Sequence, residues 1–304
     1  MIGKVKERQR SVLVTGASGF IGHHLCRRLR ESGMYVIGVS RTETQARDVD
    51  RWLVADLSRA EDVDRVMAEA KPDIVYHLAS YVVGGREVGL VRPMFEANLM
   101  STLNILIAAH THQCRRVVLT GSLEEPQPDT CWAVPSSPYA AAKFAASAYG
   151  RMFYALYELP VVMLRLFMVY GPEQRDLNKL IPYTILALKR GEPPKVSSGE
   201  RLVDWVYVDD VVDAFIACAD ADAAVGQTID IGSGELVSVR DVVVTIAKMM
   251  APEIEIAFGA VAERKHEQIR IADLGNAKQL LGWGPKTSLT EGLAATIASL
   301  SPSD

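Results

Sequence analysis

The segment VTGASGFIG, residues 14–22, decides the fold of this chain. It connects an apolar run, Ser11–Thr15, to a helical pattern over Gly19–Ser32. The first of its three glycines permits a tight turn, the second lets backbone approach a pyrophosphate, and the third lets the helix pack on the strand. Amides at the start of that helix point toward an anion. We therefore expect a dinucleotide to bind at Gly16, Ser18, Gly19, Phe20, Ile21 and Gly22; the alternative is a glycine-rich turn without a ligand.

On both sides of this turn and through the first half of the chain, apolar strands alternate with helical patterns. Continuous apolar strands of this kind are typical of a parallel sheet that is covered on both faces. The expected strands are Ser11–Thr15, Tyr35–Ser40, Trp52–Ala55, Asp73–Leu78 and Arg116–Thr120, and further helices are expected at Ser58–Ala70 and Met94–His110. The pattern predicts the α/β class with a doubly wound, Rossmann-type parallel sheet.

The second half of the chain is less regular, and we expect it to hold a smaller C-terminal α/β substrate domain. A long helix is expected at Pro138–Leu156, a strand at Gln227–Ile231 that returns to the main sheet, and a late strand at Glu253–Phe258. We assign residues 1–170 to the dinucleotide-binding domain, with returning elements from about 204–232. The substrate domain is then 171–203 and 233–304.

Composition narrows the function classes. The 304 residues carry 33 Lys plus Arg and 37 Asp plus Glu, a formal net charge of −4, which disfavours nucleic acid or an anionic membrane as the main partner. The longest apolar runs fall short of the ~20 residues that span a bilayer. The four cysteines, Cys26, Cys114, Cys131 and Cys218, lack metal-ligand spacing. The histidines are scattered, so we predict no metal and a cytoplasmic protein with free thiols.

The end of the second expected strand bears on the choice of cofactor. NAD enzymes usually place an acid there for the ribose 2′-hydroxyl, whereas an arginine suits the 2′-phosphate of NADP. The strand ends in Ser40-Arg41-Thr42, with no acid. We therefore favour NADP, with NAD as the alternative, and assign Ser40 and Arg41 to cofactor binding.

Ser137-Pro138-Tyr139 opens the long helix, with serine suited to the N-cap and proline to the first helical position. Tyr139 and Lys143 are four residues apart and share one helix face. A free phenol has a pKa near ~10, and a neighbouring ammonium lowers it. Tyr139 could then exchange a proton with an alcohol or a carbonyl while nicotinamide exchanges a hydride. The alternative is a packed tyrosine and a surface lysine.

Taken together, the motifs make the chain resemble the extended short-chain dehydrogenase/reductase family, in its nucleotide-sugar epimerase, dehydratase and reductase branch. In family order, and over nearly the whole chain, stand TGASGFIG, YHLAS, NLMSTLNIL, PYAAAK, RLFMVYGP, DWVYVDDVVDAF, IDIGSGE and LGWGP. The resemblance implies a nucleotide-diphosphate sugar as substrate. It also implies a homodimer, built on the helices at 94–110 and 138–156.

The resemblance also implies roles for individual residues. Ser122 would polarise the reacting sugar oxygen together with Tyr139 and Lys143, with Thr120 as runner-up, and Glu124 matches a dehydratase base. Arg264 matches an arginine that pairs with the substrate diphosphate. The resemblance implies that Asp56 and Leu57 contact the adenine of the cofactor and that Leu78, Ala79 and Ser80 form the wall beside its nicotinamide. Further cofactor contacts are implied for Asn98, Thr120, Tyr139 and Lys143.

Three departures from the family pattern affect the substrate side. Met168 stands where the family often has an asparagine that contacts the diphosphate. Val203 precedes Asp204 where an arginine is common, so we assign the phosphate contact to Arg201, two residues earlier. Leu123 replaces the aspartic acid of one dehydratase branch and cannot act as an acid.

These residues leave three functions to compare. The first is NADPH-dependent reduction of a nucleotide-bound 4-keto-deoxy sugar at C4, which the Ser40-Arg41-Thr42 cluster favours. The second is a 4-epimerase or 4,6-dehydratase that recycles its cofactor within each turnover, which Glu124 keeps open. The third is a non-catalytic cofactor sensor, which the presence of both Tyr139 and Lys143 disfavours.

Overall fold

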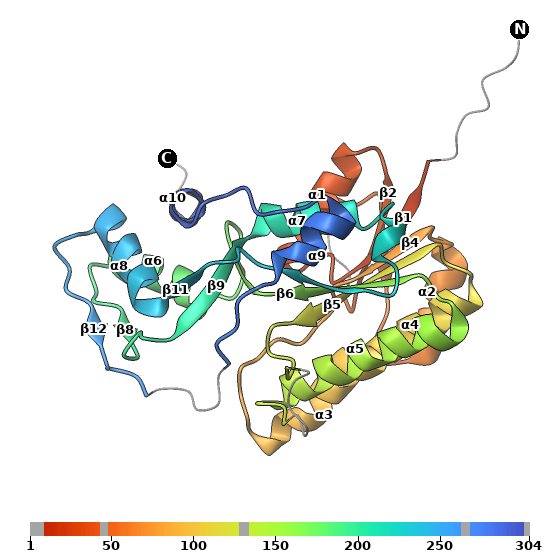
Figure 1. Ribbon diagram of the computed structural model, residues 1–304, viewed down its shortest axis with the longest axis horizontal. Helices are drawn as coiled ribbons and strands as arrows, with labels where there is room; N and C mark the ends of the chain where they lie inside the picture. The colour runs from red at the N-terminus through yellow and green to blue at the C-terminus, as the bar shows by residue number, and fades with distance from the viewer. Residues whose placement is uncertain (1–8, 43–47, 128–133, 263–267, 301–304) are drawn as a thin grey trace, which may run out of the picture. The chain divides into compact units, whose positions relative to one another are not determined.

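The computed structural model describes residues 9–42, 48–127, 134–262 and 268–300. Within these ranges one sheet has seven strands in the order β10-β6-β5-β4-β1-β2-β3 (Figure 1). The pairs β1–β2, β2–β3, β1–β4 and β4–β5 are parallel, which confirms the Rossmann-type class. The strands are β1 (Ser11–Thr15), β2 (Tyr35–Ser40), β3 (Arg51–Val54), β4 (Ile74–His77), β5 (Arg116–Ser122), β6 (Val161–Leu166) and β10 (Thr228–Ile231).

Helices cover the strands because each helix has an apolar stripe that is buried against the sheet. Val66 on α2 (Ala60–Ala70), Ile105 on α4 (Ser101–Thr111) and Phe153 on α5 (Pro138–Tyr157) join Leu13 and Val117 of the strands in one buried cluster. The strands β1 and β4 are buried along their whole length. Such strands are read from sequence as continuous apolar runs, which is why their positions were predictable.

The helix expected at Met94–His110 has a more complex structure. The chain forms α3 (Val91–Met94), then a π-helical turn over Phe95–Met100, then α4. A π turn inserts an extra residue into the helix and is often found at functional sites. Here it carries the buried Asn98.

The chain divides into two compact units. The first unit holds residues 1–120, 137–163 and 218–227; the second holds 121–136, 164–217 and 228–304. The second unit has its own apolar core, which includes Ile185, Trp205, Ile246 and Leu293.

The second unit contains two small sheets and several helices. The sheets have the orders β11-β9-β7 and β12-β8. Their strands are β7 (Met168–Tyr170), β8 (Lys195–Val196), β9 (Leu202–Tyr207), β11 (Leu236–Ser238) and β12 (Ala257–Phe258). The helices are α6 (Leu180–Lys189), α7 (Val208–Ala217), α8 (Val239–Met250), α9 (Leu274–Leu281) and α10 (Leu289–Ser299).

Two late strands were expected; one is present as expected and the other is shorter. The strand expected at 227–231 is β10, which lies beside β6 at the edge of the main sheet, as predicted. The strand expected at 253–258 is reduced to β12, because regular pairing with β8 covers only two residues.

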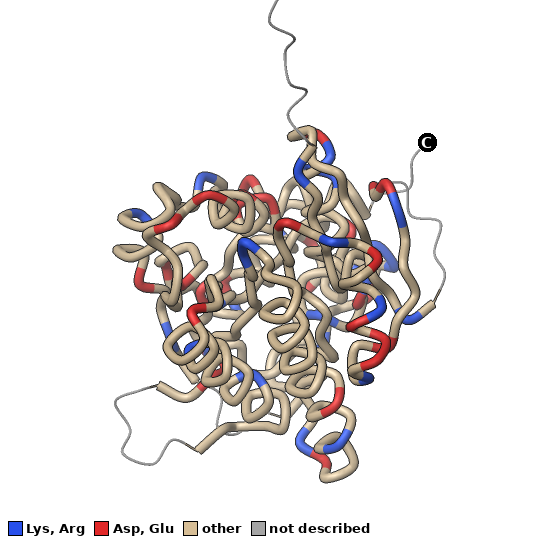
Figure 2. Tube along the Cα trace, turned by 90° about the vertical axis from the view of Figure 1, so that its right-hand side faces the viewer, with Lys and Arg blue, Asp and Glu red and all other residues tan. Residues whose placement is uncertain are grey.

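Charges of both signs are interspersed along the trace (Figure 2). Cys26, Cys114 and Cys218 are buried free thiols, and Cys131 lies outside the described residues. No helix in the described ranges combines the length and the apolar character that crossing a membrane requires.

Candidate active site

The glycine turn after β1 has the geometry of a cradle for a dinucleotide. Gly16 has a φ of +68°, which side-chain-bearing residues rarely adopt, and a Cβ there would lie 2.8 Å from the amide nitrogen of Ala79. A Cβ on Gly22 would collide with the carbonyl oxygen of Gly16. Both positions therefore require glycine, because the missing side chains let the turn, α1 (Phe20–Glu31) and the loop after β4 lie close together.

The start of α1 (Phe20–Glu31) suits an anion. Gly19 is its N-cap, so Phe20, Ile21 and Gly22 begin the helix, and Ser18 lies in the turn before it. The first turn carries no acid, whereas Arg28 and Arg30 lie in the last turn. Charges arranged in this way leave the positive end of the helix dipole available to a phosphate. The residues present thus fit the pyrophosphate of a dinucleotide.

Farther along the sheet edge are the residues assigned to the adenosine half. The Ser40 hydroxyl donates to the carbonyl oxygen of Thr42, and Arg41 is exposed. The Asp56 carboxylate accepts from both the amide and the hydroxyl of Ser58 through Oδ1. Asp56 therefore caps its own loop, the structural role that an acid at a strand end commonly has. Leu57 is buried, and its carbonyl accepts from the Asn104 side chain.

The loop after β4 and the π-helical turn hold each other in place. Asn98 Oδ1 accepts from the Ser80 hydroxyl at 3.0 Å and from the Tyr81 amide at 2.7 Å, and Asn98 Nδ2 donates to the Tyr81 carbonyl. Asn98 is almost fully buried. Its amide group thus fixes the path of the loop Leu78–Ser80, which we assigned to the nicotinamide.

Tyr139 and Lys143 lie on the first turns of α5. Ser137 caps this helix through a hydrogen bond from the Ala140 amide at 3.1 Å, with Pro138 at the first helical position, as the sequence indicated. The Lys143 Nζ lies 5.9 Å from the centre of the Tyr139 ring and donates to the Thr120 carbonyl at 3.0 Å. Because Lys143 is 5% exposed, its charge is poorly screened by water. The structure therefore places a buried cation beside the Tyr139 ring.

In the second unit, the residues that follow Thr120 form a tight turn. The Ser122 Oγ accepts from the Glu124 amide at 3.2 Å, and the Ser122 amide donates to the Glu125 carboxylate at 2.8 Å. Glu125 is 2% exposed, whereas Glu124 is half-buried. The sequence pattern indicated Glu124 and not Glu125, although an acid three residues after a serine at a strand end is a signal for such a cap.

The residues expected on the substrate side are in the second unit or outside the described ranges. Met168 begins β7, which pairs with β9 through Trp205. Arg201 immediately precedes β9 and is half-buried. Arg264 lies outside the described residues. In the described ranges no group of three His, Cys, Asp or Glu residues could hold a metal ion.

Comparisons with known proteins find relatives that match nearly the whole chain. Residues 12–232 match the model of the NAD dependent epimerase/dehydratase family. A UDP-glucose 4-epimerase of Mycolicibacterium smegmatis is 34% identical over 94% of this chain and 96% of its own. A dTDP-glucose 4,6-dehydratase of Neisseria meningitidis serogroup B is 29% identical over 95% of this chain and 92% of its own.

Two solved structures share the fold over nearly the full length. A UDP-glucose 4-epimerase of Thermotoga maritima with UDP-glucose has a TM-score of 0.86 at 27% identity and covers 95% of this chain and 97% of its own. MoeE5, in complex with UDP-glucuronic acid and NAD, has a TM-score of 0.81 at 32% identity, covering 95% and 98%.

Proposed function

Because the chain belongs to the NAD-dependent epimerase/dehydratase family of extended short-chain dehydrogenases, we propose that it is a nucleotide-sugar 4-epimerase that retains its nicotinamide cofactor. The cofactor, when bound, would take a hydride from C4 of the sugar and give it back. The observation that carries the proposal is the buried Lys143 beside Tyr139, in the same unit as the glycine turn.

Tyr139 is the residue that we propose moves the C4 hydroxyl proton. A buried ammonium favours the phenolate, since opposite charges stabilise each other more strongly away from water. Lys143 is held for this role by the Thr120 carbonyl. For Ser122 we propose the role that the resemblance implies, a hydrogen bond to the reacting sugar oxygen. Its Oγ already accepts from the Glu124 amide, so its hydroxyl hydrogen remains to be donated.

An epimerase is favoured over a 4,6-dehydratase by one residue. A dehydratase must also protonate a leaving hydroxyl, and Leu123 occupies the position of the expected acid. Leu123 is apolar and 7% exposed. The neighbouring Glu125 carboxylate is engaged by the Ser122 amide. The relative that is 34% identical, a UDP-glucose 4-epimerase, supports the same choice.

NADPH-dependent reduction of a nucleotide 4-keto-deoxy sugar is the second candidate. It is supported by Ser40-Arg41-Thr42, where no acid would repel a 2′-phosphate and the Arg41 guanidinium is exposed. Under this alternative NADPH would be consumed as a co-substrate and released as NADP⁺. For either reaction, we propose that Arg201 and Arg264 contribute to binding the nucleotide diphosphate and that Met168 contacts the substrate without a hydrogen bond to that group. For the epimerase we propose uridine as the preferred base, as in the epimerase relative.

The deciding experiment follows both cofactor and sugar. Purified protein is mixed with UDP-glucose, UDP-galactose or UDP-glucuronate, and separately with dTDP-4-keto-6-deoxyglucose plus NADPH or NADH. Interconversion of C4 epimers without net change in nicotinamide absorbance supports the epimerase. Stoichiometric NADPH loss supports the reductase, and a 4-keto-6-deoxy product from a 4-hydroxy sugar would contradict both in favour of the dehydratase.

We also propose that the protein is a homodimer that works in the cytoplasm. Large apolar side chains are exposed on α4 and α5, among them Ile107, Tyr149, Tyr154, Leu156 and Tyr157. Apolar surface of this kind on two adjacent helices favours association. The three described thiols, being free, suit a reducing compartment.

A further inference from the structure

One buried titratable side chain in the first unit takes no part in the mechanism above. His77 ends β4 and is 3% exposed. Its ring nitrogens are both engaged: Nδ1 lies 2.8 Å from the Thr15 hydroxyl and Nε2 lies 3.1 Å from the Thr102 hydroxyl. An imidazole in an otherwise apolar strand therefore links two elements that are far from it in the sequence.

The hydrogen positions in the Thr15–His77–Thr102 hydrogen bonds can be assigned from the surrounding groups. The Thr102 hydroxyl lies 2.7 Å from the Asn98 carbonyl, which can only accept, so the hydroxyl donates there. Its oxygen must then accept from His77, which places the ring hydrogen on Nε2. Nδ1 is therefore the acceptor, and the Thr15 hydroxyl donates to it. The Thr15 oxygen in turn accepts from the Ala79 amide at 3.1 Å.

This series of hydrogen bonds joins the glycine turn, which we assigned to the pyrophosphate, to the loop assigned to the nicotinamide and to the π-helical turn. Thr15 is the residue before Gly16 of the glycine turn. Ala79 lies in the loop that Asn98 fixes, and Thr102 and Asn98 lie on the helix after the π-helical turn and on that turn itself. Within this series of hydrogen bonds each donor has an acceptor, and only one arrangement of the hydrogens allows it. A fully satisfied network of this kind is rigid.

The main chain of His77 extends the same network to the proton-transfer residues. Its carbonyl accepts from the Thr120 hydroxyl at 2.7 Å. The Thr120 carbonyl accepts from Lys143 Nζ at 3.0 Å. Only one residue, Thr120, thus separates His77 from the ammonium beside Tyr139.

We propose that His77 is a positioning residue. Its neutral Nε2–H ring fixes the glycine turn, the loop after β4 and the π-helical turn as one rigid wall for the nicotinamide. The inference rests on the proposed use of a nicotinamide cofactor, and it goes further by naming the side chain that holds the cofactor's reactive end in register.

Protonation of the His77 ring would break the hydrogen bond between Thr15 and Nδ1. A second hydrogen on Nδ1 would face the Thr15 oxygen, which already accepts from Ala79 and would lose the acceptor of its own hydrogen. Burial, together with the charge of Lys143, lowers the pKa of His77 to about 3. The ring consequently stays neutral over the range in which ordinary histidines titrate.

The first test reads the ring directly and needs no substrate. Protein labelled with ¹⁵N-histidine is measured by long-range ¹H–¹⁵N NMR between about pH 5 and pH 9. We expect one histidine to keep the signature of the Nε2–H tautomer throughout. A His77 signal with the hydrogen on Nδ1, or one that titrates with a midpoint in this range, would overturn the proposal.

The second test uses substitutions that each keep one bond. An asparagine amide oxygen can replace Nδ1 as acceptor from Thr15, and a glutamine amide nitrogen can replace Nε2 as donor to Thr102. His77→Asn and Thr102→Val should therefore behave alike, since both lose the Thr102 link. His77→Gln should lose the Thr15 link, and His77→Leu should lose both.

For His77→Asn we expect the dissociation constant of NAD or NADP to rise about tenfold and kcat to fall about 10- to 100-fold. For His77→Leu we expect a larger fall in kcat. The KM for the sugar nucleotide should change little in both variants.

Thr296→Val is the matched control. Thr296 is 1% exposed and donates to the carbonyl four residues earlier, Gly292, just as Thr102 does, but it lies on α10. It should lower the melting temperature while leaving cofactor affinity unchanged.

The proposal fails if folded His77→Asn and Thr102→Val variants, measured well below their melting temperatures, bind cofactor and turn over substrate like the wild type. His77 would then be an ordinary core residue. Should His77→Leu fail to fold, these two milder variants still decide the question. Failure of the proposed function looks different: the wild type itself would then turn over no nucleotide sugar, while the effects on cofactor affinity would still report on His77.

Discussion

At the scale of single residues, the proposed chemistry depends on where Lys143 is held. An ammonium that is 5% exposed has lost most of its hydration, and the Thr120 carbonyl replaces only part of it. The remaining field acts on its surroundings, including the Tyr139 ring 5.9 Å away and the His77 ring, whose pKa it helps to lower. One buried cation thus lies beside the Tyr139 ring and also helps to keep the His77 imidazole neutral.

Removing the Tyr139 hydroxyl should stop proton transfer without disturbing the fold. For Tyr139→Phe we expect kcat to fall about 10²- to 10⁴-fold, because the group that we propose to exchange the C4 proton is then missing. Cofactor affinity, measured by fluorescence titration, should change little. Tyr149→Phe, on the same helix but 38% exposed, is the control and should keep full activity. Equal activities of the two variants would remove Tyr139 from the mechanism.

At the scale of elements, the glycine turn shows how missing side chains set the distance between a helix and a strand. Gly22 lies on the first turn of α1, directly against the Gly16 carbonyl, and Gly16 itself lies against the backbone of the loop after β4. Neither contact leaves space for a methyl group. The close approach of α1 to β1 is what directs the helix amides at the phosphate position.

A methyl group on Gly22 should therefore push α1 away from the turn. We expect Gly22→Ala to cost about 1–3 kcal/mol of unfolding free energy by overpacking and to weaken dinucleotide binding strongly. Gly89→Ala, at a position with open space around the missing Cβ, should stay within about 0.5 kcal/mol of the wild type. Urea unfolding with and without NAD measures both effects. A Gly22→Ala variant with normal affinity would show that α1 can shift without loss of the site.

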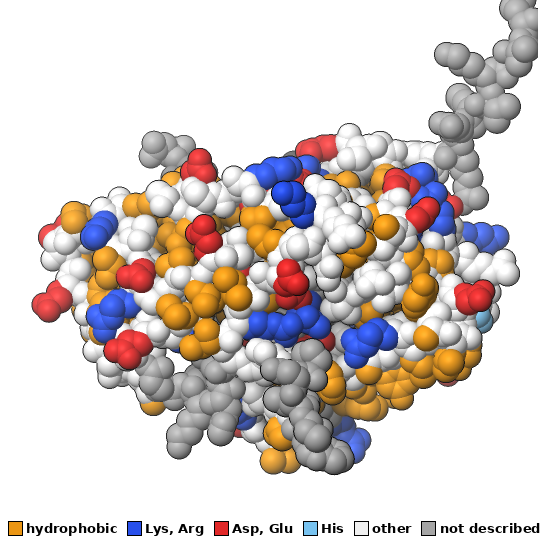
Figure 3. All heavy atoms as spheres, viewed as in Figure 1, with side chains coloured by type: hydrophobic (Ala, Val, Ile, Leu, Met, Phe, Trp, Pro, Cys, Tyr) orange, Lys and Arg blue, Asp and Glu red, His pale blue; other side chains and the backbone are white. Residues whose placement is uncertain are grey.

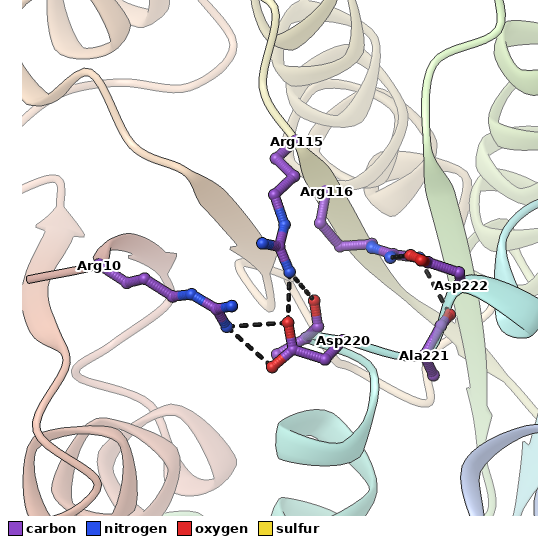
Figure 4. A network of polar contacts seen from close by, with 7 residues as sticks. Arg10, Arg115, Arg116, Asp220, Ala221 and Asp222 are labelled. Atoms are coloured by element: carbon purple, nitrogen blue, oxygen red, sulfur yellow. Dashed lines mark hydrogen bonds and ion pairs between the residues drawn. The ribbon is translucent and has the colours of Figure 1, made fainter. Parts of the chain in front are cut away.

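At the scale of the whole chain, one polar network in the first unit joins distant segments. Asp220 accepts from Arg10, just before β1, at 2.8 Å, and also from Arg115, just before β5 (Figure 4). The buried Arg116 donates to Asp222 at 2.7 Å and to the Ala221 carbonyl at 3.1 Å. The segment 218–227 is thereby attached to the starts of two strands that are more than a hundred residues away in the sequence.

This network should make stability depend on pH in one direction. The hydrogen bond from Arg10, and then that from Arg115, lower the pKa of Asp220 below its usual value. A carboxyl with a depressed folded-state pKa stabilises the protein above its unfolded pKa of ~3.9, and the contribution disappears as the pH falls through the folded value.

We accordingly expect Asp220→Asn to lower the unfolding free energy at pH 7 by about 0.5–1 kcal/mol, since the carboxylate is 60% exposed and partly screened. The difference from the wild type should shrink below about pH 4. Asp64→Asn, on the exposed face of α2, is the control. A deficit for Asp220→Asn that is the same at pH 3 and pH 7 would show that the ion pairs contribute nothing.

The proposed dimer also belongs to this scale. Hydrophobic side chains gather along the region of Figure 3 where α4 and α5 lie side by side in Figure 1. Ile107 is 53% exposed and Leu156 is 66% exposed. The double variant Ile107→Glu/Leu156→Glu should be monomeric by light scattering at micromolar concentration, because charges would be buried in the interface. Met249→Glu, on α8, should leave the mass unchanged. A wild-type monomer at that concentration would refute the dimer.

Features set by neighbours in the sequence were predictable from the sequence alone. The glycine spacing, the apolar strand runs and the Ser137-Pro138 start of α5 each act over a few residues, so strands β1 and β2 fell at the predicted residues and α5 began where expected. Local spacing also put Tyr139 and Lys143 on one helix face. These signals were sufficient for the positions of these strands, for the glycine turn before α1 and for the shared helix face of Tyr139 and Lys143.

Only the tertiary structure decided which groups His77 and Glu125 contact and where the helix takes a π-helical turn. His77 bonds to Thr15, 62 residues away in the sequence, and to Thr102, 25 residues away. A strand pattern says that a residue is buried, but not which hydroxyls meet its ring. The buried state of Glu125 follows in the same way from packing against Gly121. Hydrogen bonding between segments that are distant in the chain depends on how the strands are ordered in the sheet, and that order is fixed only when the whole core has assembled.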